Sequence, residues 1–289
     1  MQFVIMDLEW NNTYAKKKKM FFNEIIEIGA VKLDSSLQTV DTFSCLIRSQ
    51  VGKKLRGSVK RLTHISNADL NTGTLFTKAI SDLRRWIGDD ETVVFTWGDT
   101  DIRVLIENFS YLNGITTIPF LTNYCDLQAC FHRKMKTPKN NQAGLKTAAE
   151  MLQIDPEQFL QHRALGDSLM TAEIFRRIYD ENEFTPFYLA CNEDFYKRLF
   201  FKAKVICNIN NPLVDKSKLH HRCEKCGVDC DILVDWKYKN QFFRATYSCP
   251  ECQKVYAVGV KFKKYFDHVD VRKIVSVVEP EKVEEKEET

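Results

Sequence analysis

The sequence predicts an α/β protein with a mixed sheet and flanking helices, followed by a small metal-binding module. Three apolar runs near the start, at residues 2–6, 24–33 and 40–47, have short connections, which is typical of an antiparallel meander. Apolar residues at helical spacing then alternate with short apolar runs, which indicates further strands covered by helices. Two Cys-x2-Cys pairs near the end of the chain indicate the separate module.

The elements after the meander follow from the same periodicities. Two further strands are expected at residues 91–97 and 119–125, which gives a five-stranded sheet. Helices are expected, in chain order, at residues 74–88, 100–112, 142–152 and 167–179.

Composition divides the chain into four parts. We expect the main α/β domain at residues 1–185, a helical linker rich in aromatic residues at 186–210, and a ribbon-like module at 211–275. The last residues, 276–289, contain six glutamates and two lysines and are expected to form a disordered acidic tail.

The bulk composition argues against a membrane protein and against a disulfide-rich secreted protein. The chain has 289 residues, 44% of them hydrophobic, and a formal net charge of only +3. We expect no membrane partner, because no apolar run approaches the length of a bilayer span. Ten cysteines in a chain of this length do not indicate a disulfide scaffold, so the cytoplasm is the expected location.

Asp7 and Glu9 are the first candidate site residues, in the segment FVIMDLEW. Alternate side chains of a strand point to the same face, so both carboxylates should project together from the tip of a buried strand. Two neighbouring carboxylates repel each other, and a divalent metal ion is the usual compensation.

Further acids follow at the starts of two predicted helices. Asp101 lies in FTWGDTDIRVL and Asp167 in QHRALGDSLMTAEIF, with His162 five positions earlier in the preceding loop. Four carboxylates would balance the charge of two magnesium ions. Asp99 competes with Asp101 for this place, although it also suits an N-cap.

In this order, the five residues resemble the DEDDh 3′→5′ exonucleases, which have an RNase H-like fold. The resemblance covers about residues 1–185 and rests on D-L-E, W-G-D-T-D and H-R-A-L-G-D, together with EIIEIGAVKLD and KRLTHISNADL. The W-G-x-x-D form is most similar to the KapD-like bacterial proteins and the eukaryotic exonucleases that trim small RNAs and histone messages. One departure is His64, which stands in LTHIS where the family commonly has a glycine.

The resemblance implies roles for the site residues. Asp7, Glu9, Asp101 and Asp167 would bind two Mg²⁺ or Mn²⁺ ions, and His162 would be the general base. The expected reaction is release of nucleoside monophosphates from single-stranded 3′ ends, with RNA slightly favoured over DNA. Two alternatives stay open: a catalytically silent nucleic-acid-binding or protein-binding module, and a DNA proofreading exonuclease that acts with a polymerase.

Four lysines, Lys16 to Lys19, follow the first strand. If their connection lies near the acids, they could hold a phosphate backbone, and otherwise they form a solvated turn.

The C-terminal module has the ligand spacing of a zinc ribbon. Cys223-x2-Cys226 and Cys249-x2-Cys252 can supply four thiolates to one structural Zn²⁺, and Cys230, His220 and His221 are possible substitute ligands. Between the pairs, aromatic residues alternate with basic ones, in WKYKNQFFR. These aromatics could form the small core of the module or grip single-stranded nucleic acid, and the module could also bind a protein partner.

Overall fold

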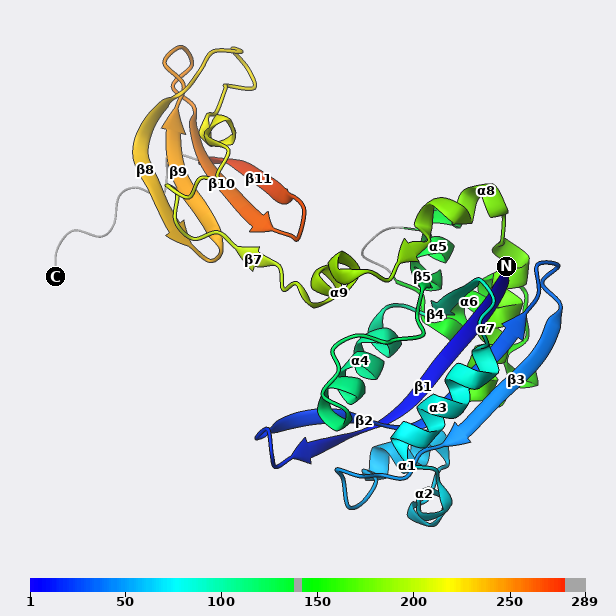
Figure 1. Ribbon diagram of the computed structural model, residues 1–289. Helices are drawn as coiled ribbons and strands as arrows, with labels where there is room; N and C mark the ends of the chain where they lie inside the picture. Colours follow the sequence, from blue (N-terminus) through cyan, green and yellow to red (C-terminus); the bar gives the residue numbers. More distant parts are fainter. Residues whose placement is uncertain (138–141, 279–289) are drawn as a thin grey trace. The chain divides into compact units, whose positions relative to one another are not determined.

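The computed structural model describes residues 1–137 and 142–278. They form two compact units, which divide between Leu199 and Phe200 (Figure 1). None of the helices in residues 1–137 and 142–278 combines the length and the apolar composition of a membrane-spanning segment.

The first unit contains a mixed sheet in the order β3-β2-β1-β4-β5-β6. Its strands are β1 (Gln2–Ala15), β2 (Met20–Leu33), β3 (Thr39–Leu46), β4 (Thr92–Thr96), β5 (Asn123–Asp126) and β6 (Leu189–Ala190). The first three form the expected antiparallel meander, while β4 and β5 are added in parallel. The expected five-strand sheet gains a sixth strand, because the two residues of β6 pair with Asn123 and Tyr124.

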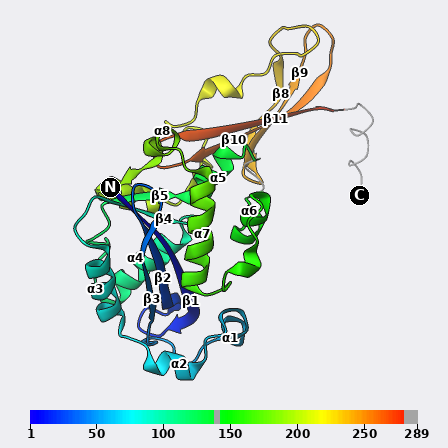
Figure 2. The ribbon, with the colours of Figure 1, turned by 90° about the vertical axis from the view of Figure 1, so that its right-hand side faces the viewer.

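Helices cover both faces of this sheet (Figure 2). The helices of the first unit are α1 (Gly57–Thr63), α2 (Asn67–Thr72), α3 (Phe76–Ile87), α4 (Thr100–Leu112), α5 (Leu127–Lys134), α6 (Leu145–Met151), α7 (Ala164–Ile178), α8 (Glu181–Phe184) and α9 (Glu193–Phe200), with the 3-10 turns η1 (Pro156–Gln158) and η2 (Thr185–Phe187). One apolar core lies under α3 and α4, and a second lies under α5, α6 and α7. Neither α1, α2 nor α5 was expected from the sequence.

β1 is longer than expected, which changes the position of the acids. The predicted strand at 2–6 continues to Ala15 and pairs with β2 along its whole length. Asp7 and Glu9 therefore lie inside a strand, and their expected position at a strand tip is wrong. They lie beyond Ile5, the last β1 residue paired with β4, so among the described strands none is paired with β1 on that edge at Asp7 and Glu9.

Two predicted boundaries also differ from the structure. Residues 186–199, expected in a linker, belong to the first unit, where Phe195, Tyr196 and Leu199 of α9 pack in its core. The predicted tail begins too early, because strand β11 continues to Val278, whereas residues 279–289 lie outside the described part.

The N-terminal end of α7 lies unusually close to the sheet at Gly29. Gly29 is paired with Asp7 across β2 and β1. A Cβ atom at Gly29 would lie 2.1 Å from the backbone of Ala164 and Leu165, so only glycine fits this position. The hydroxyl of Ser168 donates to the carbonyl of Gly29 at 3.0 Å, which fixes the contact.

A buried ion pair secures the same end of α7. Glu27 is 1% exposed and accepts hydrogen bonds from Nε and Nη2 of Arg163, the latter at 2.6 Å. The backbone N–H of Ala164 also donates to Glu27, at 3.1 Å. A buried carboxylate is tolerated when it is paired and hydrogen-bonded in this way, so Glu27 anchors α7 to β2.

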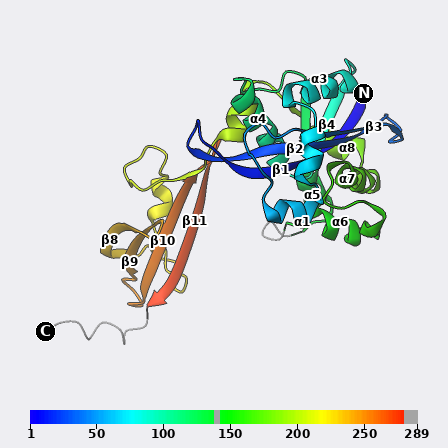
Figure 3. The same cartoon turned by 90° about the horizontal axis from the view of Figure 1, so that it is seen from below.

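The second unit has a sheet of its own, with the strand order β11-β10-β9-β8 (Figure 3). A short strand, β7, pairs with β10. Its elements are β7 (Lys204–Val205), η3 (Lys216–Leu219), β8 (Asp231–Lys239), β9 (Phe242–Ser248), β10 (Val255–Lys264) and β11 (Val269–Val278). Ile206, Val214 and Leu219 pack against one face of the sheet and form the core of the unit with it.

We expect Gly29→Ala to lower the free energy of unfolding by roughly 3 kcal/mol, because the methyl group overlaps backbone atoms that cannot move aside. Urea unfolding followed by circular dichroism measures this. Gly57→Ala is the matched control, because its Cβ would meet only the end of the Arg61 side chain, at 3.5 Å. Equal stability of the two variants would show that α7 does not need this close approach.

Candidate active site

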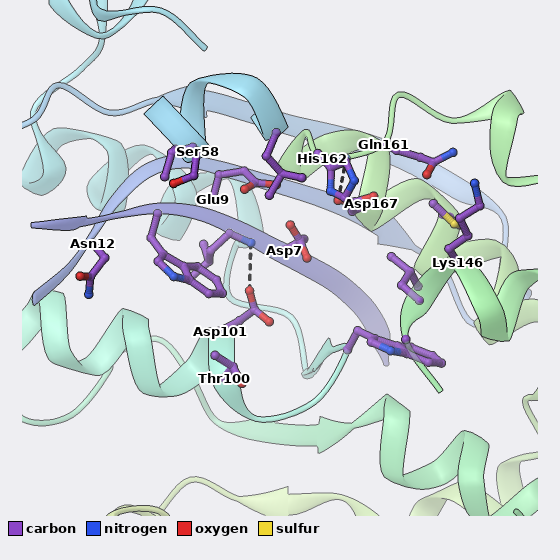
Figure 4. Close-up of a pocket in the computed structure, with 18 of the residues that line it drawn as sticks. Asp7, Glu9, Asn12, Ser58, Thr100, Asp101, Lys146, Gln161, His162 and Asp167 are labelled. Carbon is purple, nitrogen blue, oxygen red and sulfur yellow. Dashed lines mark hydrogen bonds between the residues drawn. The ribbon is translucent and has the colours of Figure 1, made fainter. Parts of the chain in front are cut away.

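Three of the predicted acids lie together beside the middle of β1. Asp7 and Glu9 project from this strand, and Asp167 reaches them from the first turn of α7 (Figure 4). One carboxylate oxygen from each residue lies within 4.8 Å of one from each of the others. Three carboxylates at this separation can share a divalent cation.

Asp101 approaches from the first turn of α4 and is 5% exposed. Its Oδ1 accepts a hydrogen bond from the backbone N–H of Leu8 at 3.1 Å, so it is fixed beside β1 but is not in the group of three. Asp99 occupies the N-cap position of α4 without a capping hydrogen bond, and its carboxylate instead pairs with Arg103 at 2.6 Å. Of these two acids, only Asp101 lines the pocket that contains the other candidates.

The electrostatics of the acids show that they lack compensation. Burial, followed by the charges of Asp101 and Asp167, raises the pKa of Asp7 well above its usual value. Burial and the charge of Asp167 raise the pKa of Glu9 to about 8. Burial is also the main reason that the pKa of Asp101 is raised to about 7 and that of Asp167 to about 6. A bound cation would reverse these shifts by favouring the charged forms.

His162 lies in the loop before α7, as the sequence predicts. Its side chain is exposed, and its backbone has a positive φ of 57°. The backbone N–H of His162 donates to Oδ2 of Asp167 at 3.1 Å, so the loop and the acid are held together. The imidazole is thus presented at the edge of the carboxylate cluster (Figure 4).

All five predicted residues line one pocket of about 750 Å³. Among the other residues that line this pocket are Arg56 and Lys146, which carry positive charge, and the large apolar residues Trp10 and Leu62. An anionic group with an attached ring system therefore finds both cationic and apolar partners there.

Glu27 and Arg163 are the site residues that sequence reasoning missed. Glu27 is paired with Glu9 across β1 and β2, and its charge contributes to the raised pKa of both Glu9 and Asp7. Arg163 holds Glu27 and is a smaller influence that lowers the pKa of Glu9. Both residues lie in segments that carry the family resemblance, Glu27 in EIIEIG and Arg163 in HRALGD. Their pairing could not be predicted from these segments, because it depends on the tertiary fold.

Two other sequence features lie outside the pocket. His64 is the C-cap of α1 with a φ of 58°, a conformation that favours glycine, and it does not line the pocket. Lys16 to Lys19 form the turn that joins β1 to β2. Lys16 lies seven positions after Glu9 along the chain, which corresponds to about 23 Å of extended strand.

In the second unit, the four predicted cysteines meet at one point. The sulfurs of Cys223, Cys226, Cys249 and Cys252 all lie within 4.8 Å of one another. The two pairs have the same local geometry, since the N–H of Cys226 donates to Cys223 Sγ and that of Cys252 to Cys249 Sγ, each at 3.5 Å.

This cluster fits a zinc ribbon. Tetrahedral zinc–thiolate bonds of about 2.3 Å require sulfur separations of about 3.8 Å. Cys223 Sγ and Cys252 Sγ are already 3.6 Å apart. The Tyr256 hydroxyl, 3.1 Å from Cys223 Sγ, is the main cause that lowers the pKa of this thiol to about 6. The possible substitute ligands Cys230, His220 and His221 are not part of the group.

Comparisons with known proteins agree with this geometry. A family model described as exonuclease (RNase_T) matches residues 4–175. The chain is 29% identical over 182 residues to the probable 3′-5′ exonuclease KapD of Bacillus subtilis, covering 63% of this chain and 86% of that protein. It is also 29% identical over 180 residues to the DNA polymerase III subunit epsilon of Aquifex aeolicus, covering 62% and 81%.

Among solved structures, the fold is similar to the nuclease domain of 3′hExo, a DEDDh family member bound to rAMP. The TM-score is 0.54 at 22% identity, and the match covers 61% of this chain and 90% of that one. The cell-death related nuclease 4 (CRN-4) matches with a TM-score of 0.53 at 19% identity, covering 61% and 62%. These similarities establish the RNase H-like fold, and the family match over residues 4–175 shows that the chain belongs to the exonuclease family.

Proposed function

We propose that the chain is a metal-dependent 3′→5′ exonuclease that releases nucleoside monophosphates from single-stranded nucleic acid. The observation that carries this proposal is the convergence of Asp7, Glu9 and Asp167 within 4.8 Å, in a pocket that Asp101 and His162 also line. The similarity to a probable 3′-5′ exonuclease supports the direction of degradation.

The residues present suit two Mg²⁺ or Mn²⁺ ions, held by Asp7, Glu9, Asp101 and Asp167. Their oxygen ligands suit hard cations, and the raised pKa values of these acids mark a charge that cations would compensate. When bound, such ions supply polarisation of the scissile phosphate and a water molecule of lowered pKa.

The chain's own residues complete the reaction. His162, exposed at the edge of the cluster, accepts the proton of the attacking water as general base. The hydrogen bond from its backbone to Asp167 keeps this loop beside the carboxylates. Arg56 and Lys146 line the pocket and provide positive charge for the phosphates of the substrate.

We propose RNA as the slightly favoured substrate. One of the similar structures is described as the recognition of a histone mRNA stem-loop by a 3′-exonuclease, and another as bound to rAMP. A DNA proofreading role is the second candidate, because the chain is also similar to a DNA polymerase III subunit epsilon.

We further propose that the second unit holds one structural Zn²⁺ through its four clustered cysteines. Four reduced thiolates suit a reducing compartment, which supports a cytoplasmic location. A protein partner of this unit remains an alternative to nucleic acid.

The function is tested with 3′-labelled single-stranded RNA and DNA in Mg²⁺ or Mn²⁺. We expect wild-type protein to release labelled mononucleotide, Asp7→Ala to release none, and His162→Ala to be slower by about 10²- to 10⁴-fold. Circular dichroism should show that both variants are folded. Wild-type rates in folded Asp7→Ala would refute the proposal, and co-purification with a polymerase together with faster DNA degradation would favour the second candidate.

Replacing Asp7 by asparagine should stabilise the metal-free fold while it destroys activity. The substitution removes one charge from a buried group of like charges, so we expect the free energy of unfolding in Mg²⁺-free buffer to rise by about 1 kcal/mol. Thermal unfolding measures this, and Asp89→Asn, an exposed acid far along the chain, is the control. A loss of stability in Asp7→Asn would mean that the carboxylate is a structural group.

Zinc should be required by the second unit alone. We expect one zinc per chain by elemental analysis of the wild type, none in Cys249→Ser, and local unfolding of residues 200–278 in that variant. Hydrolysis of a dinucleotide should persist, since the first unit has its own core. Cys207→Ser, at an exposed cysteine outside the cluster, is the matched control. Zinc retained by Cys249→Ser would contradict the four-cysteine site.

A further inference from the structure

The sheet of the second unit has two chemically different faces. One face carries the core, with Phe243, Tyr247, Tyr256 and Phe262 buried under residues 206–219. Strand pairing places the alternate residues on the opposite face, which no described element of the unit's core covers. That face has a cluster of basic side chains around one ring, which we call the cationic face: Lys237, Lys239, Phe242, Arg244, Lys261 and Arg272.

The cations of this face run across all four strands. Lys239 is paired with Phe242 across β8 and β9, and Lys261 is paired with Arg272 across β10 and β11. Lys261 Nζ lies 5.8 Å from the centre of the Phe242 ring, which joins the two pairs into one row. Four adjacent strands span about 14 Å.

Two cross-strand pairs on this face place like charges opposite each other. These are Lys237 with Arg244 and Lys261 with Arg272. Directly opposed like charges destabilise a sheet, whereas a purely structural face would set acids against them. Lys263 opposite Asp270 is such a compensated pair at the end of the same strands. The uncompensated pairs therefore indicate a face that is completed by an anionic partner.

Phe242 adds a feature that a simple charged surface lacks. It packs over Gly259, where an added Cβ would lie 3.5 Å from the ring, and it stays partly exposed. The Arg244 guanidinium lies 5.4 Å from the ring centre. A ring flanked by cations is the arrangement that binds a base and its phosphates in single-stranded nucleic acid.

We propose that the cationic face binds the sugar-phosphate backbone of the single-stranded substrate at nucleotides distant from the 3′ end. This inference rests on the proposed function for the identity of the substrate and deepens it by adding a second binding site. The second unit then adds affinity for long strands, while the pocket of the first unit acts on the terminal nucleotide.

The test compares two double variants of the full-length, zinc-loaded protein. Lys237→Gln/Arg244→Gln removes an opposed pair from the cationic face. Lys216→Gln/Lys218→Gln is the matched control, because these exposed lysines lie in η3, the segment that covers the other face. Binding of fluorescent 25-nucleotide poly(U) and poly(dT) is measured by anisotropy at several salt concentrations without Mg²⁺, in the Asp7→Ala background.

We expect Lys237→Gln/Arg244→Gln to weaken binding about 10-fold at moderate salt and to reduce the slope of log K against log salt by about 1.4, or ~0.7 for each lost phosphate contact. The control should match the parent chain. Parallel assays without Asp7→Ala should show unchanged dinucleotide hydrolysis, so failure of the nuclease proposal remains distinguishable. Unchanged affinity and salt slope in the cationic-face variant would overturn the inference, and would leave an acidic protein or the glutamate-rich chain end as the occupant.

Discussion

The close approach of α7 to β2 is the constraint on which the first unit depends. Asp167 can reach Asp7 and Glu9 only if the first turn of α7 lies almost on the backbone of β2. Gly29 permits this on one side, because any side chain there would collide with the helix backbone. Gly166 allows the loop before α7 to lie against the first turn of the helix, because a Cβ there would lie 1.9 Å from the carbonyl oxygen of Leu160. Gly29 therefore sets the distance of α7 from β2, and Gly166 sets the distance of the preceding loop from the helix.

The close contact between α7 and β2 also brings several carboxylates together, and only some of them are paired with positive groups. Glu27 is neutralised, since Arg163 and the N–H of Ala164 both bind it. Within residues 1–137 and 142–278, the carboxylates of Asp7 and Glu9 have no comparable partner, and their pKa values are raised accordingly. Such a cluster of like charges does not stabilise the fold, which supports the proposal that it binds a cation. Within a few residues of β1 and β2, the acid that anchors α7 thus differs from the acids for which we propose metal binding.

The sequence predicts the parts of this arrangement that depend on neighbouring residues. The spacing of Asp7 and Glu9 predicts that both lie on one face of a strand. The spacing from His162 to Asp167 predicts a loop residue followed by an acid in the first turn of a helix. The extension of β1 through Asn11 and Asn12 was missed, because polar residues carry no burial signal even where the backbone pairs regularly. The pairing of Glu27 with Arg163 was missed for a different reason, since 136 positions separate them. The aromatic residues of α9 looked like a linker because their partners lie elsewhere in the core.

In the second unit, strand geometry resolves an ambiguity that composition could not. The segment from Trp236 to Lys239 alternates aromatic and basic residues, and a strand sends alternate side chains to opposite faces. Trp236 and Tyr238 contact Tyr247 and Phe243 on the core side, so Lys237 and Lys239, which alternate with them, must face outward. The aromatic residues of this segment thus pack in the core, and its lysines are available to a ligand. Phe242 differs, because the turn at Asn240 and Gln241 places its ring on the face that carries the lysines. The cysteine cluster that we propose as the zinc site contains none of the residues of the cationic face.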